Sequence, residues 1–258
     1  MEFLRGPTLG RVLHSHAAGR LDPLRACRLA LQIAQGLDAV HTKGIVHRDL
    51  KPENIFILNS DGAEGGQEYV KIVDFGIAVA GRVPTMVRVA GAEDTASSEV
   101  ETSGGFTERQ TQKGTLLGTP HYMSPEQADG ADVDARSDQY ALGCILYELI
   151  TGQVPFDDPK SPTKVLMAHL SKEVEPPRKR CPEARIPEEV EAIVMRMLAK
   201  RREDRYLTIG DVAQALAQVL TTLAPDENLL LPSRSSLDNR VVPARSMTTK
   251  VVLRPRLG

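Results

Sequence analysis

Aromatic side chains are scarce in this sequence. Phenylalanine and tyrosine occur five times each among 258 residues, tryptophan is absent, and aromatics make up 4% of the chain. This scarcity does not exclude a well-filled core, because hydrophobic residues altogether reach 41% and charged residues 26%, which is ordinary for a globular protein. The length suits one large domain or two small ones.

Cysteine is also rare. The three cysteines, Cys27, Cys144 and Cys181, are far apart and odd in number. Such an arrangement favours reduced thiols in a cytosolic setting over a disulfide framework or a zinc site. His14 and His16 form a spaced pair that could ligate a metal, but there is no second pair, so we interpret them as surface residues.

Long apolar runs and a strong charge imbalance are missing too. No apolar run reaches the ~18 residues of a membrane span, and the first residues lack a basic-then-apolar signal pattern. The net charge of -2 and the pI near 6.3 argue against a general nucleic-acid or membrane-surface binder. We therefore expect a cytoplasmic protein with no nucleic-acid partner and no membrane span.

Two stretches lack any hydrophobic period. Residues 81–113 are dominated by Gly, Ser, Thr, Ala and acidic residues, and residues 224–258 hold four prolines with six basic residues against three acidic ones. Such segments bury too little apolar surface to offset the entropy lost on ordering. We expect both to be flexible, and we find no internal repeat.

The clearest regular element is a helix over residues 23–41. Its apolar residues recur at spacings of three and four, Asp22 stands at the N-cap position, Pro23 follows it, and Gly44 lies just past the end.

Other elements follow from similar signals. Apolar runs predict two strands that form a hairpin, and a nearly all-apolar helix over residues 137–150 should be buried. Thr208 with Asp211 resembles a capping box for a last helix ending near Leu223. The further predicted segments are short helices after Leu9 and over 163–170, a helix over 187–198, strands over 54–58 and 69–73, and a loop over 176–180.

One polar block carries chemistry. Residues 47–54 read His-Arg-Asp-Leu-Lys-Pro-Glu-Asn, and residues 74–76 read Asp-Phe-Gly. The hairpin presents Asn54 and Asp74 from neighbouring backbones, so both could reach one ion cluster. A base-like carboxylate, an ammonium and two metal-facing groups make up half of a phosphoryl-transfer site.

This block resembles the catalytic-loop signature of protein kinases, with the downstream Asp-Phe-Gly in its expected place. Residues 118–126, Gly-Thr-Pro-His-Tyr-Met-Ser-Pro-Glu, resemble the substrate-docking stretch, with Ser-Pro-Glu where the family usually has Ala-Pro-Glu. The resemblance implies a mainly α (α+β) fold, namely a kinase-like C-lobe with a buried central helix, a short β-hairpin under the active site and a long mobile activation loop. It places a partial kinase domain at 1–223, the loop insertion at 81–113 and a tail at 224–258.

The resemblance also implies roles. Asp49 accepts the substrate hydroxyl proton or orients that hydroxyl, Lys51 contacts the γ-phosphate of ATP, and Asn54 and Asp74 hold Mg²⁺. Lys51 and Thr119 are traits of serine/threonine kinases, so the implied partners are proteins with Ser or Thr acceptors.

Further implied positions complete the nucleotide site. The backbone around Glu2 and Leu4 would meet adenine, and Phe56 would lie under the base. Thr107, Thr111 and Thr115 are candidates for self-phosphorylation.

Other residues have implied structural roles. His47 and Phe75 pack beneath the site, and Glu126 pairs with Arg205. Arg48 pairs with an anion on the activation loop, unless it is a plain surface arginine. Asp138 accepts backbone N–H bonds from the catalytic loop, caps its helix, or does both.

The sequence departs from the family in one respect. It contains no Gly-rich loop, no lysine of the Val-Ala-Ile-Lys type and no glutamate partner for it, so the resemblance covers the hinge and large lobe only. We therefore keep two interpretations: a serine/threonine kinase, and a non-catalytic kinase-like binding or regulatory module. A small-molecule phosphotransferase is a third possibility that residues 118–126 disfavour.

Overall fold

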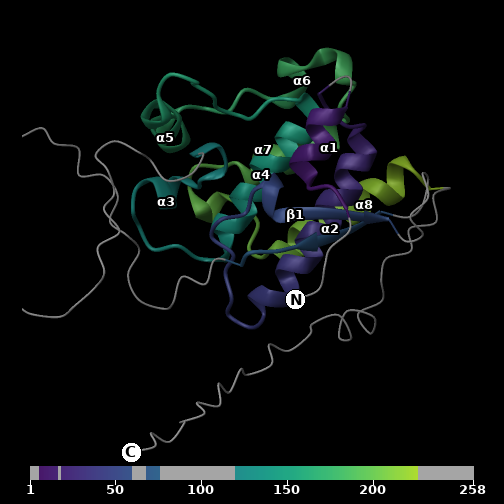
Figure 1. Ribbon diagram of the computed structural model, residues 1–258, viewed down its shortest axis with the longest axis horizontal. Helices are drawn as coiled ribbons and strands as arrows, with labels where there is room; N and C mark the ends of the chain where they lie inside the picture. The colour runs from purple at the N-terminus through teal and green to yellow at the C-terminus, as the bar shows by residue number, and fades with distance from the viewer. Residues whose placement is uncertain (1–5, 17–18, 60–67, 76–119, 226–258) are drawn as a thin grey trace, which may run out of the picture. The chain divides into compact units, whose positions relative to one another are not determined.

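The structure is a computed structural model that describes residues 6–16, 19–59, 68–75 and 120–225 (Figure 1). The expected hinge residues Glu2 and Leu4 and the whole segment from 76 to 119 lie outside these ranges. Every described helix and strand belongs to one compact unit that ends at Ala224.

The described part is mainly helical, with one small sheet. This confirms the predicted fold class. The helices are α1 (Leu9–Ser15), α2 (Pro23–His41), α3 (Pro125–Ala128), α4 (Ala135–Thr151), α5 (Pro162–Ser171), α6 (Pro177–Arg180), α7 (Glu188–Met197) and α8 (Ile209–Leu223), and the strands are β1 (Ile55–Asn59) and β2 (Glu68–Ile72).

Helix α2 has the predicted bounds. The Asp22 carboxylate accepts hydrogen bonds from the N–H groups of Leu24 and Arg25, and Pro23 occupies the first helical position. Gly44 has a φ of 74° just beyond the end, a conformation that glycine adopts without strain. Local chemistry therefore defines both ends of this helix.

Helix α4 is the buried centre of the unit, as predicted. All but three of its residues are buried, and α2 and α7 pack against it. A Cβ added at Gly143 would lie 2.9 Å from the Met197 side chain, so a larger residue would push α7 away. The left-handed Gly152 then ends the helix.

The strands form an antiparallel hairpin in which Ile57 lies opposite Val70. Its bounds differ by one residue from the predicted ones. β2 packs against α2, and β1 contacts α1 (Figure 1). The N–H of Ile57 donates to the Pro7 carbonyl, and Thr8 pairs with Phe56, so the chain that enters α1 runs along β1.

One prediction was wrong. Residues 176–180 were expected to be a loop, but Pro177–Arg180 form the single-turn helix α6, closed by the bond from the Cys181 N–H to the Pro177 carbonyl. Pro177 stands at the first helical position, where its fixed φ suits a helix. The turn also gains from α7, because the Glu191 carboxylate accepts the Arg178 N–H at 2.7 Å.

Helix α3 was not predicted as a helix. Ser124 and Gln127 form a capping box at its start, and this pair of residues in the sequence could have indicated the helix. Within the described ranges, none of the helices has the length and apolar character needed to cross a membrane.

Candidate active site

The loop between α2 and β1 is anchored to the buried start of α4. The Asp138 carboxylate accepts the backbone N–H of His47 through Oδ2 and that of Arg48 through Oδ1, both at 2.8 Å. Asp138 is 1% exposed. Because Arg48 has a φ of 66°, which is strained for a residue with a Cβ, these bonds hold a conformation that the loop alone would not favour.

His41 completes this anchor. Its Nε2 lies 2.7 Å from Asp138 Oδ2, and the carboxylate acts as the acceptor. Sequence reasoning placed His41 only at the end of α2 and missed this bond, since the two residues are 97 positions apart. No local pattern indicates such a partner.

Asp49, Lys51 and Asn54 lie together on the anchored loop. The Lys51 ammonium donates to Asp49 Oδ2 at 2.7 Å. The Asn54 Nδ2 donates to the Asp49 carbonyl at 2.9 Å and lies 3.5 Å from Asp49 Oδ2. Asn54 is buried in the turn Pro52–Asn54, whereas the Asp49 side chain is 62% exposed. The Asp49 carboxylate is therefore accessible, and hydrogen bonds hold the loop that carries it.

Asp74 reaches the same region from the hairpin. The Val73 N–H donates to the Asn54 carbonyl at 2.9 Å, so Asp74 is one residue beyond a bond that joins the two segments. Asp74 is exposed, with a φ of 52°.

His47 and Phe75 pack against each other, with ring centroids 4.9 Å apart. His47 Nε2 also donates to the Val73 carbonyl at 3.0 Å. These contacts tie the end of the hairpin to the anchored loop, and His47 is fully buried.

The segment around α3 also contacts the catalytic loop. Gln127 Nε2 donates to the Arg48 carbonyl at 2.7 Å, a contact that sequence reasoning missed. A small cavity of about 40 Å³ lies here, lined by Asp49 and Lys51 on one side and Tyr122 and Met123 on the other. Thr119, which was expected to contact the loop, lies outside the described residues.

Tyr122 has a second attachment that the sequence did not reveal. Its hydroxyl donates to Glu148 Oε2 at 2.7 Å. Burial raises the pKa of Glu148, the bond from Tyr122 opposes this shift, and the nearby charge of Glu53 adds to it. Glu148 therefore joins the segment before α3 to helix α4.

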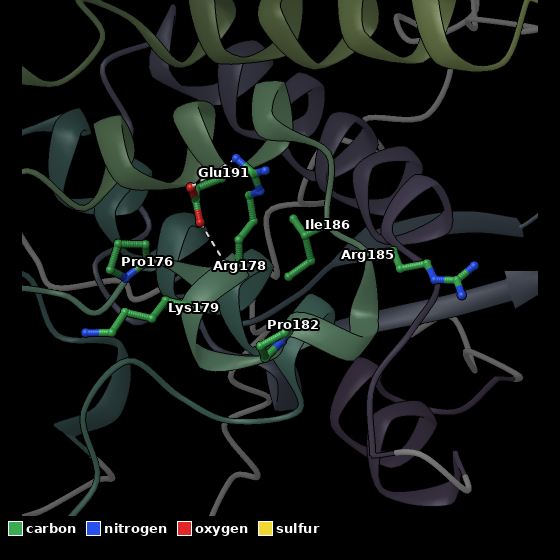
Figure 2. Close-up of a pocket in the computed structure, with 7 residues that line it drawn as sticks. All are labelled: Pro176, Arg178, Lys179, Pro182, Arg185, Ile186 and Glu191. Atoms are coloured by element: carbon green, nitrogen blue, oxygen red, sulfur yellow. Dashed lines mark hydrogen bonds and ion pairs between the residues drawn. The ribbon is translucent and has the colours of Figure 1, made fainter.

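A separate pocket of about 510 Å³ lies around α6 and the start of α7 (Figure 2). None of the expected site residues lines it. Its basic side chains point in different directions, and Arg178 is bonded to Glu188 while Lys179 is paired with Glu175. Without convergent charge, this pocket does not compete with the loop as a site for phosphoryl chemistry.

Several expected site positions fall outside the described residues. These are Glu2, Leu4, Thr107, Thr111 and Thr115. Phe56 is described and half-buried on β1, opposite Lys71 and bridged to Thr8.

Comparison with known proteins agrees with this geometry. A family model described as "Protein kinase domain" matches residues 1–218. Serine/threonine-protein kinase PknB of Mycolicibacterium smegmatis is 37% identical over 88% of this chain and 31% of its own length. Serine/threonine-protein kinase pkn2 of Myxococcus xanthus is 40% identical over 87% and 24%, respectively. The chain thus spans roughly a quarter to a third of these relatives.

Solved structures show the same fold. The kinase domain of Mycobacterium tuberculosis PknI superposes with a TM-score of 0.56 at 22% identity, covering 84% of this chain and 63% of that one. The Rad53 kinase domain, solved in complex with AMPPNP, gives a TM-score of 0.57 at 21% identity, covering 83% and 66%. Together with the match over residues 1–218, these likenesses establish that the chain belongs to the protein kinase domain family.

Proposed function

We propose that this chain is the catalytic C-lobe of a serine/threonine protein kinase that transfers the γ-phosphoryl group of ATP to protein hydroxyls. The observation that carries the proposal is the bonded cluster of Asp49, Lys51 and Asn54 beside the strand end that bears Asp74. The names of the relatives agree with it.

The cluster suits the reaction step by step. The substrate hydroxyl oxygen attacks the γ-phosphorus and its proton passes to Asp49, while the bond to the ADP oxygen breaks and ADP leaves with that electron pair. Lys51 places positive charge beside the phosphoryl group in transit. Its bond to Asp49 keeps the two side chains within reach of the same substrate atoms.

Magnesium fits the donor set that Asn54 and Asp74 offer. The Asn54 Nδ2 donates to the Asp49 carbonyl, so the amide oxygen is the proposed ligand atom, and Asp74 follows the residue whose N–H donates to the Asn54 carbonyl. In the described ranges no group of three or more His, Cys, Asp and Glu forms a metal cluster. Mg²⁺ binds through one or two protein oxygens and the phosphates of its nucleotide. When bound, the ion neutralises phosphate charge.

The remaining assignments extend the same proposal. Glu2 and Leu4 meet adenine through their backbone, and Phe56 lies under the base. Self-phosphorylation is proposed at Thr107, Thr111 or Thr115. The domain runs over residues 1–223, with an activation-loop insertion at 81–113 and a tail at 224–258.

We also propose a cytoplasmic location. The thiols of Cys27, Cys144 and Cys181 are all free and buried. Burial, together with the charge of Asp22, raises the pKa of Cys27 to about 12, so this thiol stays protonated and unreactive. Three unpaired thiols suit a reducing compartment.

The proposed activity is tested with radiolabelled ATP and Mg²⁺. The purified chain, at high concentration, is assayed for transfer to itself and to generic protein substrates. Asp49→Asn is expected to remove any transfer, and Asp132→Asn, which changes an exposed carboxylate outside the site, is expected to leave it unchanged. Measurable transfer that is equal in the parent chain and in Asp49→Asn would show that Asp49 is not the base.

A second function is favoured by one observation. The sequence contains no G-x-G-x-x-G loop and no Val-Ala-Ile-Lys lysine to cover and pair the phosphates. Each lost electrostatic contact costs ~10²- to 10³-fold in rate. Residues 1–258 alone should therefore show very weak transfer or none, and act as a kinase-like binding module. Robust turnover that Asp49→Asn abolishes would exclude this alternative.

A further inference from the structure

The outer edge of β2 is bonded by a side chain of α2. Only one edge of β2 faces β1. On the other edge, Gln32 Nε2 donates to the Glu68 carbonyl and Gln32 Oε1 accepts the Val70 N–H, both at 3.0 Å. The amide group thus offers one donor and one acceptor to the strand, as a neighbouring strand would.

Two further contacts extend this attachment along α2. Arg25 donates to both carboxylate oxygens of Glu68, from Nε at 3.0 Å and from Nη2 at 2.6 Å. One turn beyond Gln32, Gly36 lies so close to β2 that an added Cβ would stand 3.2 Å from the Ile72 side chain.

The three α2 residues meet alternate residues of β2. Arg25 contacts Glu68, Gln32 bonds Glu68 and Val70, and Gly36 faces Ile72. We call this arrangement the α2–β2 seam. A slip of β2 by one residue would turn its backbone groups away from Gln32, so the seam supports the register that pairing with β1 sets.

Strand register matters because β2 leads directly to the proposed magnesium ligand. Ile72 is two positions before Asp74. Asn54, in contrast, is held by the Asp49 carbonyl on the catalytic loop, independently of the seam. The two proposed ligands are thus held by different side-chain contacts, although the Val73 N–H also joins the end of β2 to the Asn54 carbonyl.

We propose that Gln32 is a positioning residue that sets Asp74 relative to Asn54, so that both oxygens reach one nucleotide-bound divalent ion. The inference rests on the proposed function. Gln32 itself is half-buried and does not face the catalytic loop residues in any described contact, so it acts through β2.

The test compares the parent chain with Gln32→Met, which keeps the side-chain length and helix propensity but removes both bonds. Gln35→Met is the matched control, since Gln35 is half-buried on the same helix. MgATP affinity is measured by calorimetry, and Mn²⁺ with ATP is used to broaden amide NMR signals near the ion. Hydrogen exchange at the Val70 amide reports the seam directly.

Gln32→Met is expected to weaken MgATP binding about three- to tenfold, because each lost hydrogen bond is worth only a small factor. Mn²⁺ broadening should decrease at Asp74 and Phe75 and persist at Asn54, while Val70 exchanges faster. Gln35→Met should match the parent. Gln32→Glu keeps an acceptor for the Val70 N–H, so its MgATP affinity should lie between those of the parent chain and Gln32→Met. It replaces Gln32→Met in the test if that variant fails to fold.

The outcomes separate the two claims. A parent chain that does not bind MgATP would overturn the proposed function and this inference with it. A parent chain that binds, with Gln32→Met unchanged in affinity and broadening, would overturn only the inference. Equal loss of broadening at Asn54 and Asp74 would also overturn it, because that result indicates general loosening rather than positioning.

Discussion

Arg205 and Glu126 form a buried two-bond ion pair across 79 positions of sequence. Arg205 Nη1 lies 2.8 Å from Glu126 Oε1 and Nη2 lies 2.9 Å from Oε2, and the side chains are 0% and 7% exposed. Ser137 also donates to Glu126 at 2.6 Å. The pair fixes helix α3 to the segment before α8, and each charge is fully hydrogen-bonded.

Arg205→Met should be strongly destabilising, because it leaves the Glu126 carboxylate buried without a counter-charge. We expect the free energy of unfolding in urea to fall by ~3–5 kcal/mol. Arg201→Met is the control: Arg201 is 76% exposed and 3.8 Å from Glu203, and such surface pairs contribute less than about 1 kcal/mol. Equal losses in the two variants would contradict the importance of burial.

Stability should depend on pH through His169. Burial lowers the pKa of His169 from 6.5 to about 3, and the charges of Lys200 and His121 act in the same direction. Because the folded pKa lies below the unfolded one, the stabilisation is complete above pH 6.5 and is lost as the pH falls towards 3. Over this range the free energy of unfolding should decrease by about 1.4 kcal/mol per pH unit.

Urea unfolding between pH 7 and pH 4.5 measures this slope. His169→Gln should make it shallower, whereas His16→Gln, at an exposed position, should not change it. The ionisation of Glu126 affects the unfolding free energy only at lower pH. Burial opposes that ionisation, but hydrogen bonds from Arg205 and Ser137 prevail and lower the pKa of Glu126 from 4.5 to about 2. An unchanged slope in His169→Gln would refute the assignment to His169.

Asp138→Asn should loosen the catalytic loop. The amide keeps one acceptor, but it turns a donor towards groups that also donate, namely the N–H groups of His47 and Arg48. We expect a loss of ~2–4 kcal/mol in unfolding free energy and faster hydrogen exchange at His47 and Arg48. Asp134→Asn, at the N-cap of the same helix, keeps a capping oxygen and should cost less than about 1 kcal/mol without changing that exchange.

Asp22→Ala should weaken the start of α2. The substitution removes the acceptor for the N–H groups of Leu24 and Arg25 and should lower the unfolding free energy by about 1 kcal/mol. Asp22→Ser retains a capping oxygen and should recover most of that loss in the same thermal or urea unfolding measurement. Identical stabilities of the alanine and serine variants would argue against capping.

Much of the fold was predictable because its signals are local. Asp22 with Pro23 marked the start of α2, Thr208 with Asp211 marked the start of α8, and the apolar stretch over residues 137–150 indicated the buried α4. The failures have physical causes as well. Helix α6 is a single turn, and a bond from Arg178 to Glu191 on another helix helps to hold it.

The sequence alone determined where both strands and all α-helices except α3 and α6 lie, and which polar block carries the chemistry, because capping, periodicity and motif spacing act within a few residues. The resemblance already implied that Asp138 accepts backbone N–H groups of the loop, and the structure confirms it. Only the tertiary structure decided the further partners, namely His41 on Asp138, Gln127 on the Arg48 carbonyl and Gln32 along β2. These hydrogen bonds depend on distances between segments far apart in the chain, and no local pattern encodes such distances.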